Sequence, residues 1–265
     1  MNTVLYSNES SYYSMIARLV LAEKVVPYES HLIDIHLKLD QFKPEYLKIQ
    51  PNMTVPVLDH NGIIINDSKD ILFYVNKNFS GPDLMPSEDS DEIQRQIELH
   101  YEFSIEDFTM GKFVRQSPIA RFGLNHGLKR AVRRCHQLIK NYPEFRVAVE
   151  NKLELEKERV EHILSKNNNY AEMYQKAIDI CDILEKKLGD HEYIASNKYS
   201  LADVVWTTFL ARLHMAKEES LVNSHKLLHE YWEKMKLRPS FVKADIWTSM
   251  RISKILMILG SIFMR

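Results

Sequence analysis

The feature that most constrains the fold is the stretch TVPVLDHNGIIINDSKD at residues 54–70. Its Pro56 is expected at the first residue or the edge of a strand, because proline cannot donate a ladder hydrogen bond. Asn61 and Gly62 between two apolar runs predict a two-residue hairpin turn, since both turn positions need positive φ. Asp67 and Ser68 then stand where the pattern turns helical, and the first N–H groups of a helix lack intrahelical acceptors. The stretch therefore predicts strand, turn, strand and a capped helix start.

The residues before this stretch alternate short β-like runs with short helical patterns. The periodicity predicts strands at 3–7 and 28–35, helices at 14–24 and 44–48, hairpin strands at 57–58 and 63–65, and a helix at 68–77. The order is βαβ, a short helix, then ββα. A right-handed crossover makes the first two strands parallel, and the hairpin adds antiparallel strands to the same sheet. Residues 1–79 are therefore expected to form a thioredoxin-like α/β domain.

The sequence pattern changes after this predicted domain. Gly81, Pro82 and Pro86 lie within a few residues and predict a linker at residues 80–88. Residues 89–265 are helical in pattern, so we expect an all-helical second domain. Its expected helices cover residues 91–112, 128–140, 144–165, 170–188, 201–216 and 227–237. Ser200 and Asp203 form a capping-box variant at the start of one of them.

The composition narrows the classes of function. A net charge of -1 gives no overall field that attracts nucleic acid, so no nucleic-acid partner is expected. Two cysteines, Cys135 and Cys181, are too few for a disulfide framework and indicate a reducing compartment such as the cytoplasm. No signal-peptide pattern is recognised at the N-terminus.

The C-terminal run ILMILGSIFMR (255–265) is apolar, but a helix that spans a bilayer takes about 20 apolar residues. Two interpretations of this tail stay open. It is a terminal helix packed on the body, or it lies in a membrane interface with Lys254 and Arg265 as flanking charges. The second interpretation predicts a peripheral membrane location through contact of the tail with the surface.

The order of these motifs resembles a known family. Val-Pro-Val-Leu at 55–58, Asp-Ser at 67–68 and Ser-Leu-Ala-Asp at 200–203 are similar to the cytosolic glutathione transferases. A long inserted helical segment and the C-terminal extension resemble one branch, that of the plant tetrachlorohydroquinone dehalogenase-like transferases and the animal ganglioside-induced differentiation-associated proteins. Segments similar to that branch are NYPEF (141–145), KLELEKER (152–159), EYW (230–232) and RPSF (238–241). The resemblance implies a detoxifying homodimeric enzyme that binds glutathione as co-substrate and activates its thiol for attack on a hydrophobic electrophile.

The resemblance also assigns residues to the peptide part of glutathione. Val55 presents its N–H and C=O to the cysteinyl backbone beside Pro56, whose peptide bond is cis in the family. Ser68 at a helix start suits the γ-glutamyl carboxylate, and Asp67 suits the ammonium group or positions the helix turn. For the glycyl carboxylate, the polar residues Gln41 and Lys43 before the short helix are the candidates, both expected to be exposed.

The partner of the sulfur is expected in the turn after the first strand. Anchoring the turn on Ser14 and Arg18 places Ser11 where serine-type transferases keep their catalytic serine. A hydroxyl at a helix N-terminus donates to a thiolate and, with the helix dipole, favours ionisation of the thiol. Ser10 and Tyr12 in the same turn are alternatives. The turn has no cysteine, which argues against the disulfide-forming chemistry of cysteine-type relatives.

Two further patterns carry less weight. The candidate walls of an electrophile pocket are Tyr101, Phe103, Phe108 and Phe113, although an aromatic stripe belongs more often to a core. His225 and His229 share one helix face at metal-ligand spacing, but a third ligand is not evident, so no metal is expected.

Alternative functions stay open beside the enzyme. The first is a catalytically weak, transferase-like interaction protein that associates with a membrane, as the animal relatives do. The basic cluster KRAVRR (129–134) suits lipid headgroups or a phosphate, and equally an ordinary solvated helix face. A regulator similar to the stringent starvation proteins is a third interpretation, which the near-neutral charge and the added helices favour less.

Overall fold

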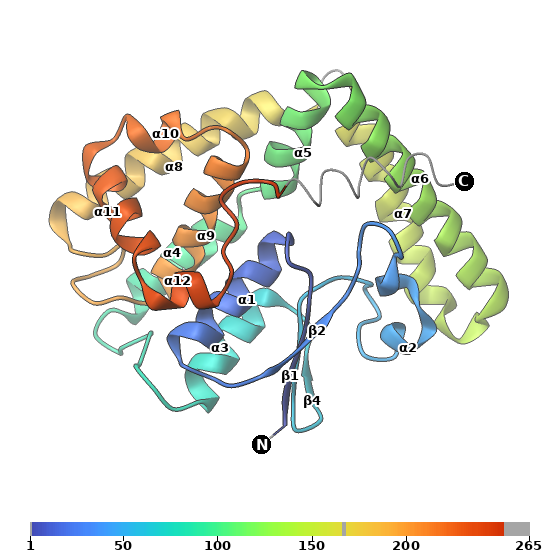
Figure 1. Ribbon diagram of the computed structural model, residues 1–265, viewed down its shortest axis with the longest axis horizontal. Coiled ribbons are helices and arrows are strands. Elements are labelled where there is room, and N and C mark those ends of the chain that lie inside the picture. The colour runs from blue at the N-terminus through green and yellow to red at the C-terminus, as the bar shows by residue number, and fades with distance from the viewer. Residues whose placement is uncertain (1, 166–167, 252–265) are drawn as a thin grey trace.

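The computed structural model describes residues 2–165 and 168–251 of the 265-residue chain. Figure 1 shows a small twisted sheet with α1 and α3 on one side and α2 on the other. A larger helical region lies beside it, and its long helices α6 and α7 extend next to α2. The expected thioredoxin-like domain followed by a helical domain with a long inserted segment is confirmed.

The first domain has the predicted order of elements. They are β1 (Thr3–Ser7), α1 (Tyr12–Glu23), β2 (Glu29–Leu32), the 3-10 helix η1 (Asp40–Phe42), α2 (Pro44–Leu47), β3 (Val57–His60), β4 (Ile63–Ile65) and α3 (Ser68–Asn78). Strand β2 is shorter than the predicted run at 28–35, and its four residues are all exposed. Residues without a buried face give a strand no packing that would extend it.

The sheet has the strand order β2-β1-β3-β4. β1 runs parallel to β2, and it is antiparallel to β3, with Leu5 opposite Leu58. The hairpin of β3 and β4 turns at Asn61 and Gly62, whose φ angles of 55° and 87° are those that the Asn-Gly signal predicts.

The helical region contains nine α-helices and one 3-10 helix among the described residues. They are α4 (Ser90–Tyr101), α5 (Ile105–Gln116), α6 (Pro118–Asn141), the 3-10 helix η2 (Pro143–Phe145), α7 (Arg146–Ile163), α8 (Tyr170–Asp190), α9 (Leu201–Met215), α10 (Ser220–Asn223), α11 (Lys226–Lys236) and α12 (Pro239–Lys243). The linker predicted at 80–88 falls between α3 and α4, and the division of the chain at this point stays a prediction.

Two of the predicted helices in this region differ from the structure by more than two residues. The helix expected at 91–112 is divided, because the chain leaves helical geometry after Tyr101 and Ser104 caps a new helix by accepting the N–H of Asp107. Helix α6 begins ten residues before the predicted 128. Gly123 and Gly127 interrupt the apolar period in its first half, so the sequence pattern gave no helical signal there. In the structure Ser117 caps the start of this helix.

Helices α6 and α7 form an antiparallel pair that packs on the first domain (Figure 1). Their buried side chains share an apolar cluster with the segment of η1 and α2. The cluster contains Leu39, Phe42, Leu47 and Met53 from the first domain and Ala131, Cys135, Leu138, Val149 and Leu153 from α6 and α7. The inserted helices therefore cover an apolar face of the thioredoxin-like domain of their own chain.

A second and larger cluster joins the two domains at their main contact. It includes Met15 of α1, Leu72 of α3, Ile93 of α4 and Trp206 of α9. The C-terminal segment adds polar contacts, since Arg18 of α1 donates from Nε to the carbonyl of Ala244 at 2.7 Å. The apolar tail at 255–265 lies outside the described residues. Within the described ranges, every helix is too short or too polar to cross a bilayer.

Candidate active site

The sheet register brings four loops together at one end of the sheet. The last residue of β1, Ser7, is level with Leu32 at the end of β2, because these strands are parallel. β3 is antiparallel to β1 and starts at Val57 opposite Tyr6, and the end of β4 pairs with the start of β3. The segments after β1, β2 and β4 and the segment before β3 therefore adjoin. They contain every residue that the sequence assigned to glutathione.

The segment before β3 offers an unpaired stretch of main chain. The Val55–Pro56 peptide bond is cis, as the family resemblance implies. Tyr46 donates from its hydroxyl to the carbonyl of Thr54 at 2.7 Å and holds the preceding residue. Neither the N–H nor the C=O of Val55 pairs with the backbone of any residue in 2–165 or 168–251. Both groups can pair with an extended peptide laid beside them.

The start of α3 provides donors and one carboxylate. Asp67 is the exposed N-cap, and its Oδ1 accepts the N–H of Lys69 at 2.7 Å. The N–H groups of Ser68 and Asp70 have no acceptor among the described residues. Ser68 is buried, and its hydroxyl lies 2.9 Å from the hydroxyl of Tyr101 on α4. A helix start with free N–H groups and a serine hydroxyl is suited to an anion.

Asn8 organises the turn between β1 and α1. Its Oδ1 accepts both the N–H and the hydroxyl of Ser10, at 3.1 and 2.9 Å. Its carbonyl accepts Arg18 Nη1 at 3.1 Å, and its Nδ2 donates to the carbonyl of Ile33 at 2.9 Å. Asn8 was not among the predicted site residues, although an asparagine side chain often bonds the backbone two residues further on.

The structure separates the three candidates for the sulfur contact. The hydroxyl of Ser10 is bound to Asn8 and lies 3.0 Å from His36 Nε2. Tyr12 is buried, with its hydroxyl 2.5 Å from His100 Nε2, and burial raises the pKa of this phenol well above its usual value. Both alternatives are therefore held by protein partners.

Ser11 is the candidate with a free hydroxyl proton. It caps α1, where its Oγ accepts the N–H of Ser14 at 3.4 Å, and it is partly exposed. The hydroxyl proton has no acceptor among the described residues, so it remains available to a ligand. Ser11 therefore stays the proposed sulfur contact.

The two candidates for the glycyl carboxylate differ from the expectation. Lys43 is exposed, and its Nζ pairs with Asp40 at 2.7 Å. Gln41 is buried, so the expected exposure was wrong for this residue: its side chain folds back and donates from Nε2 to the carbonyl of Ile35 at 3.4 Å. The buried Oε1 has no partner among the described residues.

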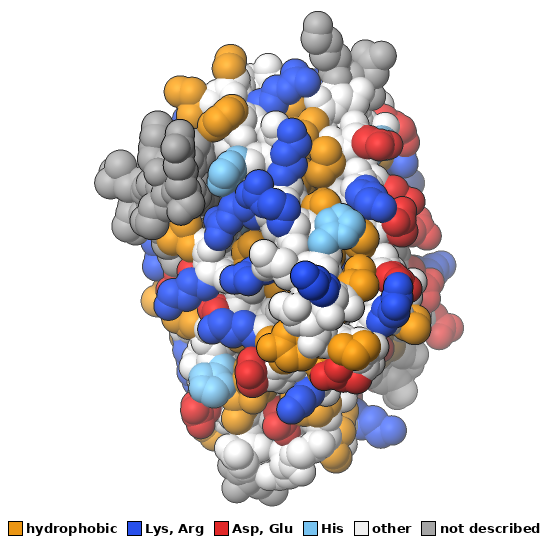
Figure 2. Space-filling model, turned by 90° about the vertical axis from the view of Figure 1, so that its right-hand side faces the viewer, with side chains coloured by type: hydrophobic (Ala, Val, Ile, Leu, Met, Phe, Trp, Pro, Cys, Tyr) orange, Lys and Arg blue, Asp and Glu red, His pale blue; other side chains and the backbone are white. Residues whose placement is uncertain are grey.

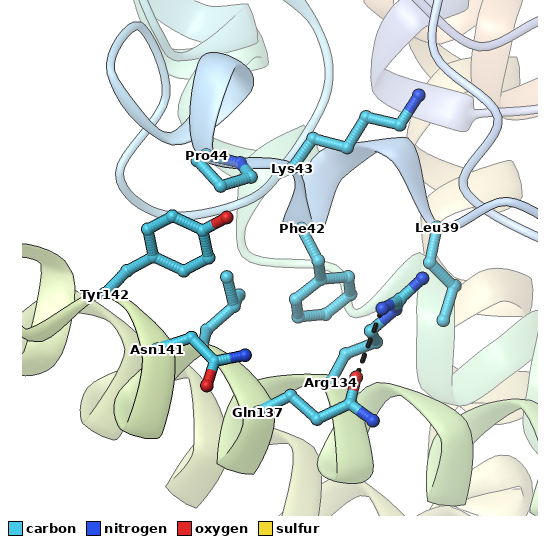
Figure 3. A pocket seen from close by; sticks show the side chains of 9 residues that line it. Leu39, Phe42, Lys43, Pro44, Arg134, Gln137, Asn141 and Tyr142 are labelled. Atoms are coloured by element: carbon cyan, nitrogen blue, oxygen red, sulfur yellow. Dashed lines mark hydrogen bonds between the residues drawn. The ribbon is translucent and has the colours of Figure 1, made fainter.

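A pocket of about 200 Å³ lies next to these residues, between η1, α2 and the end of α6. Figure 3 shows Phe42 and Tyr142 beside it, with Arg134 donating to Gln137, while Lys43 extends away from α6. The pocket is on the α6 side of η1, whereas the four loops adjoin at the end of the sheet. We therefore do not assign it to glutathione.

Of the aromatic residues predicted to line an electrophile pocket, some belong to the core and one lies at the site. Phe103 and Phe108 are buried in the cluster that joins the domains, so both are core residues. Tyr101 instead stacks on Tyr13 of α1, with ring centroids 6.1 Å apart and planes within 10°. This pair stands next to Ser68 and borders the candidate site.

Two protein-family models match this chain and identify its family. The N-terminal domain model of glutathione S-transferase matches residues 5–83, and the C-terminal domain model matches residues 150–239. The chain belongs to the glutathione S-transferase family. The stretch between the two matches contains α6, the first of the inserted helices.

Relatives over nearly the full length support the family and the expected branch. The chain is 27% identical to the tetrachloro-p-hydroquinone reductive dehalogenase of Sphingobium chlorophenolicum, with 91% of this chain and 95% of that protein covered. It is 26% identical to glutathione S-transferase TCHQD of Arabidopsis thaliana, with 90% and 88% covered. The β-etherase LigF of a Sphingobium species has the same fold, with a TM-score of 0.68 at 20% identity over 92% and 98% of the two chains.

The remaining chemistry-bearing residues have protein partners or are buried. His225 pairs through Nε2 with Asp182 at 2.9 Å, and His229 lies 3.0 Å from the side chain of Asn223. Cys135 and Cys181 are free thiols, and burial raises the pKa of each to about 12. Protonated, buried thiols are unreactive.

Proposed function

We propose that this protein is a glutathione transferase that binds glutathione at the end of the sheet and activates its thiol. In this proposal Val55 pairs with the cysteinyl backbone beside Pro56. The γ-glutamyl carboxylate lies at the start of α3 with Ser68, and its ammonium group meets Asp67. Gln41 or Lys43 contacts the glycyl carboxylate, and Ser11 donates to the sulfur.

The observation that carries the proposal is the register of the sheet. It gathers an unpaired main-chain edge at Val55, free N–H groups at the start of α3 and a free hydroxyl at Ser11 around one site. Glutathione presents two carboxylates, an ammonium group, two amides and a thiol. We assign each of these groups to a complementary protein group among those loops.

The chemical task of the protein is to hold the thiol ionised near neutral pH. The proton leaves the sulfur for solvent, and the hydroxyl of Ser11 at the N-terminus of α1 stabilises the thiolate that remains. Lowering a thiol pKa by two units corresponds to about 2.7 kcal/mol of preferential stabilisation of the thiolate. The thiolate then attacks an electrophilic carbon, a sulfur–carbon bond forms, and the leaving group departs with its electron pair.

The second substrate is proposed to be a hydrophobic electrophile that enters beside Tyr13 and Tyr101. The name of the Sphingobium relative indicates a chlorinated hydroquinone as the substrate of that protein. We also propose a cytoplasmic homodimer with a detoxifying role. Because α6 and α7 cover the face of η1 and α2, this dimer would use other surfaces.

Calorimetric titration with glutathione, together with a thermal shift in its presence, tests the site. We expect saturable binding and a higher melting temperature, since a ligand that binds the native state stabilises it. Replacement Ser68→Ala should weaken binding by about tenfold, the effect of one lost hydrogen bond to a charged group. The matched control Ser220→Ala changes an exposed serine on α10. Folded protein that shows neither heat nor a thermal shift at millimolar glutathione would contradict the proposal.

A second candidate function is association with an anionic lipid surface through α6. This 24-residue helix has six Lys and Arg residues and no Asp or Glu. The six are Arg121, Lys129, Arg130, Arg133, Arg134 and Lys140. None of them forms an ion pair within the described part of the chain. Figure 2 shows Lys and Arg side chains gathered on this face, with hydrophobic side chains between them.

Flotation with vesicles of mixed anionic and neutral phospholipid tests this candidate. We expect the full chain to float with anionic vesicles, and the double variant R133Q/R134Q to float less, because each basic residue near such a surface contributes about 1 kcal/mol. A chain truncated before Ile252 measures the separate contribution of the tail. If the full chain floats equally well with purely neutral vesicles, the basic side chains of α6 are not the cause of membrane binding.

A further inference from the structure

Arg212 of α9 is a buried cation beside the turn that contains Ser11. Only 8% of its surface is exposed. Its Nη2 donates to the carbonyl of Ser10 at 3.1 Å. That carbonyl belongs to the peptide bond that leads directly into Ser11, so the guanidinium lies within one residue of the proposed sulfur contact.

The positive charge of Arg212 has no carboxylate counter-ion in the part of the chain that the structure describes. It forms no ion pair with a carboxylate of residues 2–165 or 168–251, and its buried Nε has no acceptor there. Arg18, equally buried beside the same turn, places its donors on four backbone carbonyls. Arg238 forms a two-point ion pair with Glu23. A guanidinium has five N–H donors, and Arg212 uses one of them in a hydrogen bond to the described residues, which leaves this buried charge poorly compensated.

The ionisable groups that face Arg212 are neutral at physiological pH. They are the phenols of Tyr12, whose ring lies 5.3 Å from the guanidinium carbon, and of Tyr13, both on α1. His100 of α4 is in contact with Tyr12, and burial lowers its pKa to about 3. Burial also lowers the pKa of Arg212 to about 10, which leaves it protonated at pH 7. A net positive charge therefore remains in a water-poor environment at this turn.

We propose that the anion missing from this environment is the thiolate of bound glutathione, and that Arg212 lowers the pKa of the bound thiol. The inference rests on the proposed function, since it requires glutathione at the site. Arg212 acts as a positioning residue through the Ser10–Ser11 peptide and as a charge at short range. The step involves one proton, which passes from the sulfur to solvent, and neither oxidation nor reduction.

Three variants separate charge from structure. Arg212→Gln keeps a donor for the carbonyl of Ser10 and removes the charge, Arg212→Lys keeps the charge, and Arg212→Met removes both. Arg95→Met, at an exposed position of α4, is the control for loss of one positive charge. Circular dichroism and melting temperature establish that each variant folds. If Arg212→Met does not fold, Arg212→Gln and Arg212→Lys carry the comparison.

The measurement is the ultraviolet absorbance of the glutathione thiolate on the protein as a function of pH, with binding followed by calorimetry. A unit charge a few ångström away in a partly buried site shifts a pKa by about one to two units. We therefore expect Arg212→Gln to raise the pKa of the bound thiol by at least about one unit, with Arg212→Lys and Arg95→Met close to the wild type.

The possible failures are distinguishable. If Arg212→Gln binds glutathione as the wild type does and the thiol pKa is unchanged, the role of Arg212 is refuted while the proposed function stands. If Arg212→Lys shifts the pKa as much as Arg212→Gln does, the charge is not the cause and the inference is also refuted. If the wild type does not bind glutathione, both the proposed function and the inference fall.

Discussion

The hydroxyl of Tyr12 and Nε2 of His100 lie 2.5 Å apart, and both residues are buried where α1 meets α4. The two rings are also nearly parallel, with an interplanar angle of 15°. The other ring nitrogen of His100, Nδ1, is buried without a partner among the described residues. The protonated ring carries an N–H on both nitrogens, so the N–H at Nδ1 would be buried without an acceptor among the described residues.

This contact predicts a pH dependence of stability. Burial lowers the pKa of His100 from 6.5 to about 3 in the folded protein. The unfolded chain therefore binds the extra proton between pH 6.5 and 3, and stability falls as the pH falls through that window. Between pH 7 and 5 we expect the wild type to lose about 2 kcal/mol more unfolding free energy than His100→Gln does. Urea unfolding at several pH values measures this difference in unfolding free energy. The variant His136→Gln, at an exposed position of α6, is the control. If the unfolding free energies of wild type and His100→Gln fall equally with pH, the assignment to His100 is refuted.

The role of Ser11 predicts a change in thiol ionisation. Ser11→Ala removes a hydrogen bond to a charged sulfur, which contributes about 1.5–3 kcal/mol, so the pKa of bound glutathione should rise by about one to two units. Loss of the N-cap should also cost about 1 kcal/mol of stability. Ser10→Ala, whose hydroxyl is bound to Asn8, is the matched control. Full conjugating activity of Ser11→Ala at neutral pH would show that another group contacts the sulfur.

Asp203 predicts a large structural effect away from the site. Its buried carboxylate accepts the N–H groups of Ser200 and Ile194 at 2.8 and 3.1 Å and the hydroxyl of Tyr231 at 2.8 Å. Asp203→Ala leaves these donors without an acceptor and should cost about 4 kcal/mol in chemical denaturation. Asp203→Asn keeps an acceptor oxygen and should cost less than half of that. The exposed Asp190→Ala should stay close to the wild type.

The contact between the inserted helices and the first domain predicts energetic coupling. Phe42 and Leu138 belong to one cluster although they come from η1 and α6. Each replacement by alanine should cost about 3 kcal/mol, through lost burial and a residual cavity. Because neighbours share this cavity, the double variant should cost less than the sum of the two. Strict additivity in a double-mutant cycle would show that the two side chains do not share a packing unit.

Local signals in the sequence predicted the first domain nearly element by element. Asn61 and Gly62 determine the hairpin because few residue pairs adopt positive φ at both positions, and the Ser200–Asp203 box marks the start of α9 by a contact within one turn. Where the local signal was weak, the prediction failed. Gly123 and Gly127 hide the first half of α6, which the packing of α6 on α7 stabilises regardless of propensity.

Only the site residues that follow from a local pattern, or from the order of the family's motifs along the chain, could be predicted. Val55, Pro56, Asp67 and Ser68 follow from their order along the chain. The contacts of His100 with Tyr12 and of Arg212 with Ser10 join residues 88 and 202 positions apart. A polar residue on an otherwise apolar helix gives no indication of the distant partner that it meets, so periodicity alone does not reveal these pairs.

The apolar contact of α6 and α7 with the first domain bears on how far the two domains can move relative to one another. The two domains contact one another through the cluster around Met15 and Trp206. The inserted helices pack on the thioredoxin-like domain a second time, at η1 and α2. A swing of one domain about the segment at 79–89 would have to separate both sets of contacts at once. Movement of the two domains relative to one another is therefore opposed by two separate apolar clusters, and the inserted helices stiffen the molecule on the side of α2.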